Sequence, residues 1–152
     1  MREDMTVKLF VYYSLSGNGE AVAARMAGLG YTCRRAVPEK PMPKAFFLRI
    51  MKGGFLAGIG AKEKLRDFDA SAEGADEVAV GSPIWNGRLT PAVNAVLSGM
   101  DLTGRRVRFV LWSASGEAAP AVKRLAKEYP GADVTILKEP KADPTELDKL
   151  AV

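Results

Sequence analysis

Residues 9–21, LFVYYSLSGNGEA, join three kinds of sequence that decide the fold. The apolar and aromatic run at 9–13 is typical of a buried strand, and the small polar residues at 14–19 are typical of a tight loop. From Glu20 onward, apolar residues recur at helical spacing. A loop in this position presents backbone N–H groups at a helix start, where the helix dipole favours an anion. The stretch therefore predicts a strand, an anion-binding turn and a helix; the alternative is a plain capped turn.

The composition indicates one globular domain. The 152 residues are 47% hydrophobic and 26% charged, which are ordinary values, and we expect a single domain over residues 1–152. No apolar run reaches the roughly 18 residues of a membrane-spanning helix. The start, MREDM, is acidic where a signal peptide is basic, so we expect a cytoplasmic protein that does not insert into a membrane.

The residue types present exclude several chemistries. The chain has no histidine, which rules out Ser-His-Asp and Cys-His catalysis and His-based zinc sites. We find no metal-ligand cluster, no catalytic side chain and no nucleic-acid-binding motif, so we expect no metal and no nucleic-acid partner. The single cysteine, Cys33, cannot form an intrachain disulfide, and we expect it to be a buried strand residue rather than a nucleophile.

Strands and helices alternate along the chain. The patterns predict strands over 7–13, 31–37, 77–81, 105–113 and 133–138, and helices over 20–28, 44–52, 90–99 and 117–129 with a short one from Asp143 onward. Thr90 is expected to cap the helix that Pro91 begins, and 55–60 has no clear assignment. This alternation predicts an α/β fold, a three-layer, doubly wound, five-stranded parallel sheet. Ligands bind such sheets beyond the carboxyl ends of the strands, so the loops after strands are the candidate site.

Three of these loops carry unusual residues. Ser14–Gly19 lacks the lysine of the P-loop that binds nucleoside triphosphates, and it lacks the glycine spacing of a dinucleotide-binding loop. The loop 81–91, GSPIWNGRLTP, places Trp85 on an Asn-Gly turn, where it is suited to stacking on a flat ligand; the alternative is that it folds into the core. The loop 111–120 repeats a Ser-x-Ser-Gly pattern before a helix. We expect the three loops to lie on one edge of the sheet.

The segments YYSLSGNGEAVAARMA, KAFFLRIMKGGFLAGIGAKEKL and GSPIWNGRLTPAVNAVL, in this order, resemble the flavodoxin-like family, and more closely its members with a Gly-Ser/Thr-Pro-Ile/Val-Trp loop. The resemblance covers about Val7 to Leu150 and implies a sheet of order 2-1-3-4-5 that binds flavin mononucleotide (FMN). The implied phosphate-binding residues are Ser14, Ser16, Gly17, Asn18 and Gly19. Those implied around the isoalloxazine ring are Pro83, Ile84, Trp85, Asn86 and Gly87, with Ser113, Ser115, Gly116 and Glu117 at its pyrimidine edge. Two departures are that Gly19 stands where many relatives have Thr, and that the third loop lacks the aromatic residue that often flanks the ring in the family.

The charge is unevenly distributed along the chain. Residues 34–66 carry nine basic and two acidic side chains, a net charge of +7, whereas the whole chain has a net charge of only +4. This excess is read first as a solvated face. It otherwise suits docking of an acidic redox partner or binding of NAD(P)H, and cations near a reduced, anionic flavin would make its second reduction potential less negative than in an acidic flavodoxin. Arg88 is read in the same way, as a surface residue or a substrate anchor.

The resemblance implies electron transfer or FMN-dependent reduction of a small acceptor, so whether the protein is an enzyme stays open. The alternative is a flavodoxin-fold binding or scaffold module that has lost its flavin. A monomer and a dimer are equally compatible with the sequence.

Overall fold

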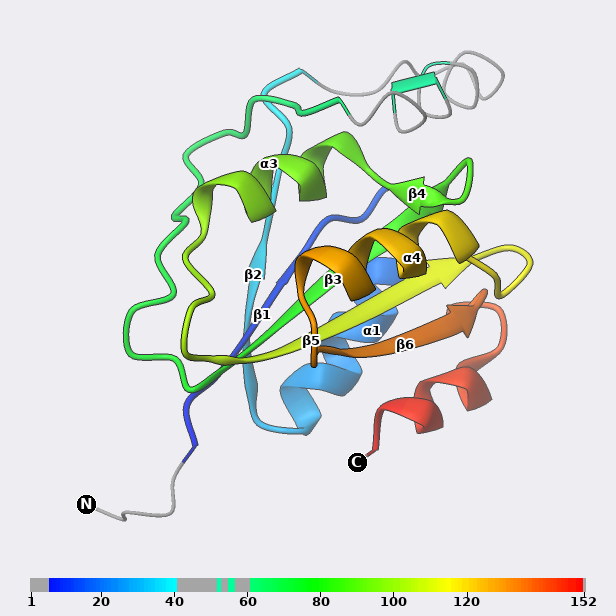
Figure 1. The fold of residues 1–152 in the computed structure, drawn as a ribbon. Coiled ribbons are helices and arrows are strands. Elements are labelled where there is room, and N and C mark those ends of the chain that lie inside the picture. Colours follow the sequence, from blue (N-terminus) through cyan, green and yellow to red (C-terminus); the bar gives the residue numbers. More distant parts are fainter. Residues whose placement is uncertain (1–5, 41–51, 53–54, 57–60, 152) are drawn as a thin grey trace.

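Five parallel strands form the sheet at the centre of the protein (Figure 1). The computed structural model describes residues 6–40, 52, 55–56 and 61–151. The strands are β1 (Lys8–Tyr12), β2 (Tyr31–Arg35), β3 (Glu77–Trp85), β5 (Arg106–Ser113) and β6 (Asp133–Lys138). They pair in the order β2-β1-β3-β5-β6, which is the predicted 2-1-3-4-5 when the parallel strands are numbered along the chain.

Helices cover both faces of the sheet, which confirms the predicted three layers (Figure 1). One face is covered by α1 (Asn18–Gly28) and the short 3-10 helix η1 (Pro144–Leu150), and the other by α3 (Pro91–Gly99) and α4 (Ala119–Glu128). In the described part of the chain, no helix is both long and apolar enough to cross a bilayer. The helix predicted over 44–52 lies outside the described residues except for Lys52, which is helical.

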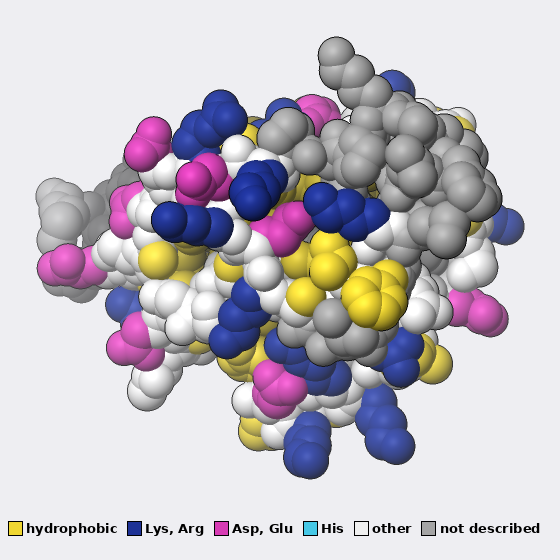
Figure 2. All heavy atoms as spheres, turned by 90° about the horizontal axis from the view of Figure 1, so that it is seen from above, with side chains coloured by type: hydrophobic (Ala, Val, Ile, Leu, Met, Phe, Trp, Pro, Cys, Tyr) yellow, Lys and Arg dark blue, Asp and Glu magenta, His cyan; other side chains and the backbone are white. Residues whose placement is uncertain are grey.

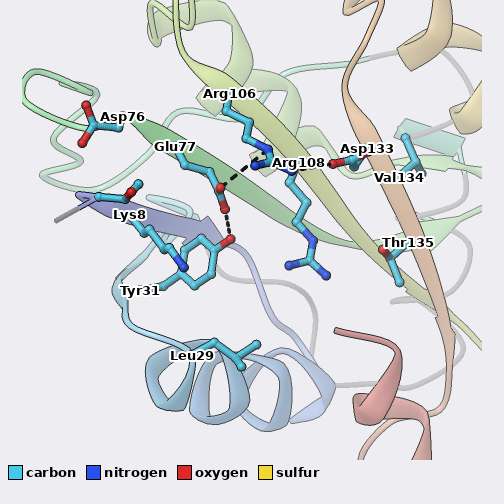
Figure 3. A pocket seen from close by; sticks show the side chains of 11 residues that line it. Lys8, Leu29, Tyr31, Asp76, Glu77, Arg106, Arg108, Asp133, Val134 and Thr135 are labelled. Carbon is cyan, nitrogen blue, oxygen red and sulfur yellow. Dashed lines mark hydrogen bonds and ion pairs between the residues drawn. The ribbon is translucent and has the colours of Figure 1, made fainter. Parts of the chain in front are cut away.

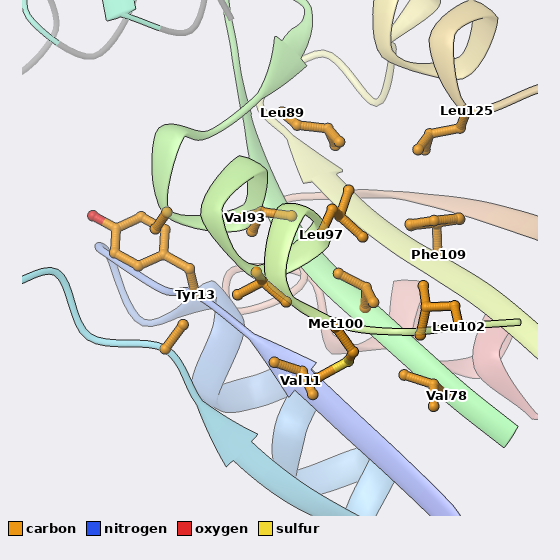
Figure 4. Packing of buried hydrophobic residues seen from close by; sticks show 14 of the residues in the cluster. Val11, Tyr13, Val78, Leu89, Val93, Leu97, Met100, Leu102, Phe109 and Leu125 are labelled. Atoms are coloured by element: carbon orange, nitrogen blue, oxygen red, sulfur yellow. The ribbon is translucent and has the colours of Figure 1, made fainter. Parts of the chain in front are cut away.

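The two faces of the sheet pack into two hydrophobic clusters. Along β1, Val11 points into the cluster under α3 and α4, while Phe10 points into the cluster under α1 and η1; both are fully buried. Strands covered on both faces are apolar throughout, which explains the continuous apolar run at 9–13. Figure 4 shows the first cluster, in which Val93 and Leu97 of α3 lie over the sheet. Burial of each such side chain contributes about 1.5–3 kcal/mol to folding.

The third strand is longer than predicted and turns back on itself. β3 runs to Trp85, beyond the expected end at Gly81, and pairs antiparallel with β4 (Arg88–Leu89). The connecting residues, Asn86 and Gly87, have φ values of 53° and 73°. Two consecutive positive φ angles define the tight turn that matches the twist of a hairpin. The sequence showed the turn but not the strand pairing around it.

Cys33 is exposed, so the prediction of a buried strand residue is wrong. It lies on β2, the edge strand of the sheet, where only part of each side chain is covered. Its Sγ lies 3.4 Å from the carbonyl oxygen of Ala23 in α1. This partial burial raises the pKa of the Cys33 thiol, which keeps it protonated at neutral pH.

Thr90 precedes α3 as expected, but its side chain does not cap the helix. The hydroxyl lies 3.2 Å from the Ser82 hydroxyl, and both residues are fully buried. The Ser82 hydroxyl also accepts the backbone N–H of Thr90 at 3.3 Å. This pairing joins the two strands of the hairpin and competes successfully with capping, because a buried hydroxyl needs a partner.

Candidate functional site at the carboxyl edge of the sheet

The three predicted loops follow β1, β3 and β5, and the structure brings them to one edge of the sheet (Figure 1). These strands are neighbours and run in parallel, with Tyr12 opposite Gly81 and Ser82 opposite Leu111. Their carboxyl ends therefore meet at the same edge, where ligands bind in folds of this type.

The first loop is built around the buried side chain of Ser14, which is 4% exposed. Its hydroxyl accepts the backbone N–H of Gly19 at 3.1 Å and donates to a carboxylate oxygen of Glu20 at 2.7 Å. Ser14 thus holds the start of α1 against the end of β1. It was predicted as a phosphate ligand, but its only hydrogen already has an acceptor within the protein.

The backbone of this loop provides the free donors. The N–H groups of residues 15–18 donate to no other described residue, and Gly17, the N-cap of α1, lies in the left-handed region at φ 91°. Ser16 is exposed beside them, and Asn18 is half-buried. A cluster of unpaired N–H groups at a helix start is the donor set that a phosphate requires.

A fourth loop, which sequence reasoning missed, completes this region. It joins β6 to η1, and the backbone N–H of its Lys141 donates to Oδ1 of Asn18 at 2.9 Å. The side chain lies against the first loop, since Lys141 Nζ is 3.0 Å from the position that a Cβ on Gly17 would take. The rule that led to the other loops, inspection of the residues after each strand, would have found Lys141 if applied to β6.

The sequence allowed Trp85 either to face a ligand or to fold into the core, and its observed position is intermediate. It is half-buried and packs on the edge of the core, and its ring meets Tyr13 edge-on at 5.8 Å and 87°. Of its predicted companions, Pro83 is buried in β3, Ile84 is half-buried against the core and Asn86 is exposed.

The turn beside Trp85 is held from two sides. The backbone N–H of Ala121 in α4 donates to the carbonyl of Gly87 at 2.9 Å. The guanidinium of Arg88, exposed at the surface, donates to the carbonyl of Asn86 at 3.0 Å. Both carbonyls are thereby fixed, so the hairpin is a rigid support for Trp85.

The third loop is closed by its own polar groups. Ser113 donates its hydroxyl to the carbonyl of Glu117 at 3.1 Å, and the backbone N–H of Glu117 donates to Ser115 Oγ at 3.2 Å. Gly116 has φ 76° and lies beside Lys138, with 3.3 Å between its virtual Cβ and the Cβ of that lysine. Ser115 and Glu117 are exposed.

Contacts connect the four loops around this edge, with the second and third loops joined through α4. The first loop meets the second through the rings of Tyr13 and Trp85, and the second meets α4 through Gly87 and Ala121. The third meets the fourth where Glu139 donates its N–H to the carbonyl of Ser113 at 3.2 Å, and the fourth returns to the first through Lys141 and Asn18. Glu139 has φ 44°, a strained value for a residue with a side chain. The fourteen predicted site residues all lie in the first three loops or at the strand and helix ends that flank them.

A cavity of about 800 Å³ lies at the opposite, amino edge of the sheet. Figure 3 shows its charged lining, in which Glu77 contacts both the Tyr31 hydroxyl and Arg106. Arg106 also lies 3.9 Å from Asp133, and the buried Arg108 donates to the carbonyl of Leu150 at 3.1 Å. These side chains largely satisfy one another, and the amino edge is not where ligands bind parallel sheets of this type. The candidate site is therefore the carboxyl edge.

The basic excess of residues 34–66 is partly neutralised in the folded protein. Two acids outside the segment pair with it: Arg34 lies 3.5 Å from Asp69, and Arg35 lies 2.9 Å from Glu20. The face seen from above in Figure 2 still shows Lys and Arg side chains on several sides of a group of exposed hydrophobic side chains. This face is less positive than the sequence count alone suggests, but it keeps a basic character.

Comparison with known proteins identifies the fold. A proposed flavoprotein from Bacteroides eggerthii DSM 20697 superposes with a TM-score of 0.74 at 21% identity, over 97% of this chain and 99% of the other. A second, from Bacteroides uniformis ATCC 8492, gives 0.73 at 21% identity over 85% and 86%. A flavoprotein from Lactobacillus acidophilus NCFM, whose structure is a complex with FMN, gives 0.67 at 18% identity over 97% and 100%. No protein-family model and no curated protein matches the chain. The protein has a flavodoxin-like fold over nearly its whole length.

Proposed function

We propose that this protein binds FMN non-covalently at the carboxyl edge of its sheet and acts in electron transfer or as a reductase of a small acceptor. The observation that carries the proposal is the first loop, where four adjacent backbone N–H groups are unpaired among the described residues at the start of α1. The likeness to a flavoprotein solved with FMN, at 18% identity, supports the same ligand.

The residues of this edge fit the cofactor. The N–H groups of residues 15–18 would hold the phosphate, because they are unpaired among the described residues and lie at a helix start, where the helix dipole is positive. Trp85 and the turn after it would border the ring system, and the loop 113–117 would border the edge beyond it. Gly17 and Gly116 lie close to the side chains of Lys141 and Lys138, so each glycine lets a lysine approach the backbone of this edge.

When bound, FMN would supply one- or two-electron redox chemistry. The protein's part is to bind and orient it. The Gly87 and Asn86 carbonyls are fixed by Ala121 and Arg88, so a ring placed against this turn would meet groups in a set orientation. Half-buried Trp85 would exclude water from one side of the ring. Residues 114–118, after β5, include no aromatic side chain, which would leave another side accessible to an electron donor or acceptor.

The donor or acceptor would be an acidic redox protein or NAD(P)H, since exposed basic side chains flank this part of the surface. Arg88 is exposed and donates to the carbonyl of Asn86 in the hairpin turn. Long-range attraction of this kind mainly raises the rate of encounter and weakens with salt.

One observation favours a second candidate, a flavodoxin-fold module without flavin. The Ser14 hydroxyl donates to Glu20, and that carboxylate stands beside the first loop, where a negative charge opposes phosphate binding. Arg35, 2.9 Å from Glu20, offsets this charge, which is why the FMN-binding proposal is preferred.

The test is a visible absorption spectrum after incubation with FMN and removal of the excess by desalting. The proposal predicts that the two bands of oxidised flavin remain with the protein in about equimolar amount. Asn18→Ala, in the first loop, should weaken retention, whereas Arg106→Gln at the amino-edge cavity should leave it unchanged. A colourless protein after desalting, with no change in flavin fluorescence during titration, would favour the module without flavin.

A further inference from the structure

The turn that carries Lys141 is fixed at both ends. The backbone N–H of Asp143 donates to the carbonyl of Glu139 at 2.8 Å, which closes the turn between β6 and η1. Its Glu139 donates to Ser113 in the third loop, and its Lys141 donates to Asn18 in the first. The position of Lys141 relative to α1 is therefore set by hydrogen bonds across 123 residues of sequence.

The side chain of Lys141 follows the backbone of the first loop. Its Nζ and Cδ lie 3.0 and 3.2 Å from the virtual Cβ of Gly17, inside ordinary van der Waals contact. Any other residue at position 17 would displace this lysine, and the φ of 91° already requires glycine there. The glycine thus allows the ammonium group of Lys141 to lie beside the backbone of the first loop.

The charges around the loop are balanced unequally. Glu20 is 2.9 Å from Arg35, which also donates to the carbonyl of Ser14 at 3.2 Å, so these two opposite charges neutralise each other. Lys141, in contrast, has no carboxylate within 4.0 Å among the described residues. Its charge adds to the positive end of the α1 dipole, and its exposed ammonium can bind an anion that enters the loop.

From this geometry we infer that Lys141 is a phosphate-binding residue of the cofactor site and makes it select FMN over riboflavin. The inference rests on the proposed function and adds to it the group that distinguishes the two flavins. Contacts from Trp85 and the third loop would be the same for both flavins, because the rings are identical. Only FMN carries a phosphate for the ammonium of Lys141 to bind.

The experiment compares Lys141→Gln with Lys127→Gln, which removes the same charge from an exposed lysine in the last turn of α4. Dissociation constants for FMN and riboflavin are measured by flavin fluorescence at low and high salt. Loss of one charge-assisted hydrogen bond should raise the dissociation constant for FMN about tenfold in Lys141→Gln. Riboflavin affinity should change less than about twofold, the salt dependence for FMN should become shallower, and Lys127→Gln should match the wild type.

Two results would overturn the inference while leaving FMN binding intact: an unchanged dissociation constant for FMN in Lys141→Gln, or an equal loss for both flavins, which would show that Lys141 only supports the loop. Lys141→Arg keeps the charge and should retain selectivity for FMN if the inference holds. A wild-type protein that binds neither flavin would instead overturn the proposed function itself.

Discussion

Replacing Gly19 with alanine would test whether Ser14 and the start of α1 are as tightly packed as the structure shows. A Cβ at position 19 would lie 2.3 Å from Ser14 Cβ and 2.6 Å from Ser14 Oγ. Neither atom can move away by a simple rotation, because the Cβ is fixed to the backbone of β1's end and the Cα of Ser14 is also only 3.2 Å distant. The loop or the helix start must shift.

The expected cost is the balance of three effects. Overpacking in a dense region costs about 1–3 kcal/mol. Loss of the hydrogen bond from the Gly19 N–H to Ser14 Oγ adds roughly 0.5–1.5 kcal/mol. The higher helix propensity of alanine returns up to about 1 kcal/mol. The net prediction for Gly19→Ala is a free energy of unfolding lower by about 2 kcal/mol.

The assay is urea unfolding followed by circular dichroism, with Gly28→Ala as the matched control. Gly28 is the last residue of the same helix, and a Cβ there would meet nothing within 4 Å. That variant should be neutral or more stable by up to about 1 kcal/mol. Ser14→Gly combined with Gly19→Ala removes the clashing atoms and should restore part of the loss. If Gly19→Ala were as stable as Gly28→Ala, the packing argument for this loop would be refuted.

Three further predictions address other parts of the site. Gly87→Ala should lower the free energy of unfolding by about 1–2 kcal/mol in the same urea assay, because φ is 73° and the new Cβ would lie 3.0 Å from Cδ of Pro120; an unchanged midpoint would contradict the turn geometry. Trp85→Leu should weaken FMN binding and restore fluorescence of the flavin that remains bound, so persistent quenching would show that the ring lies elsewhere. The pKa of Glu146 is lowered mainly by the hydrogen bond from the Lys149 side chain and, to a smaller extent, by the one from the Lys138 backbone N–H. Its contribution to stability is therefore complete above the unfolded pKa of about 4.3 and is lost as pH falls through the lowered native value. Glu146→Gln should flatten the pH dependence of unfolding in this acidic window, and parallel curves for variant and wild type would contradict that role.

The sequence was sufficient for the architecture because the relevant signals are local. Apolar runs such as 9–13 report strands buried on both faces, and the alternation with helices limits the sheet to a few topologies. The same reasoning placed three loops at one edge, as the structure shows. Whether their fourteen predicted residues bind FMN stays a prediction.

What the sequence did not reveal depends on contacts between distant segments. Lys141 belongs to the site because η1 packs beside α1, with Arg25 3.0 Å from Asp148, and this brings the turn before η1 to the start of α1. Cys33 was wrongly expected to be buried. A short strand with alternating apolar residues has the same sequence pattern whether it lies at the edge or in the middle of a sheet. Threonine is a residue type that caps helices well, but the Thr90 hydroxyl instead pairs with the buried hydroxyl of Ser82.

A two-dimensional amide NMR titration with FMN, followed at the glycine signals, tests directly whether the flavin binds at the carboxyl edge of the sheet. A flavin site at the carboxyl edge predicts large shifts for Gly17, Gly19, Gly87 and Gly116, which lie in the loops of that edge. It predicts small ones for Gly30, Gly104 and Gly131, which precede strands at the amino edge. Shifts confined to the second group, or none in either, would contradict a flavin site at the carboxyl edge.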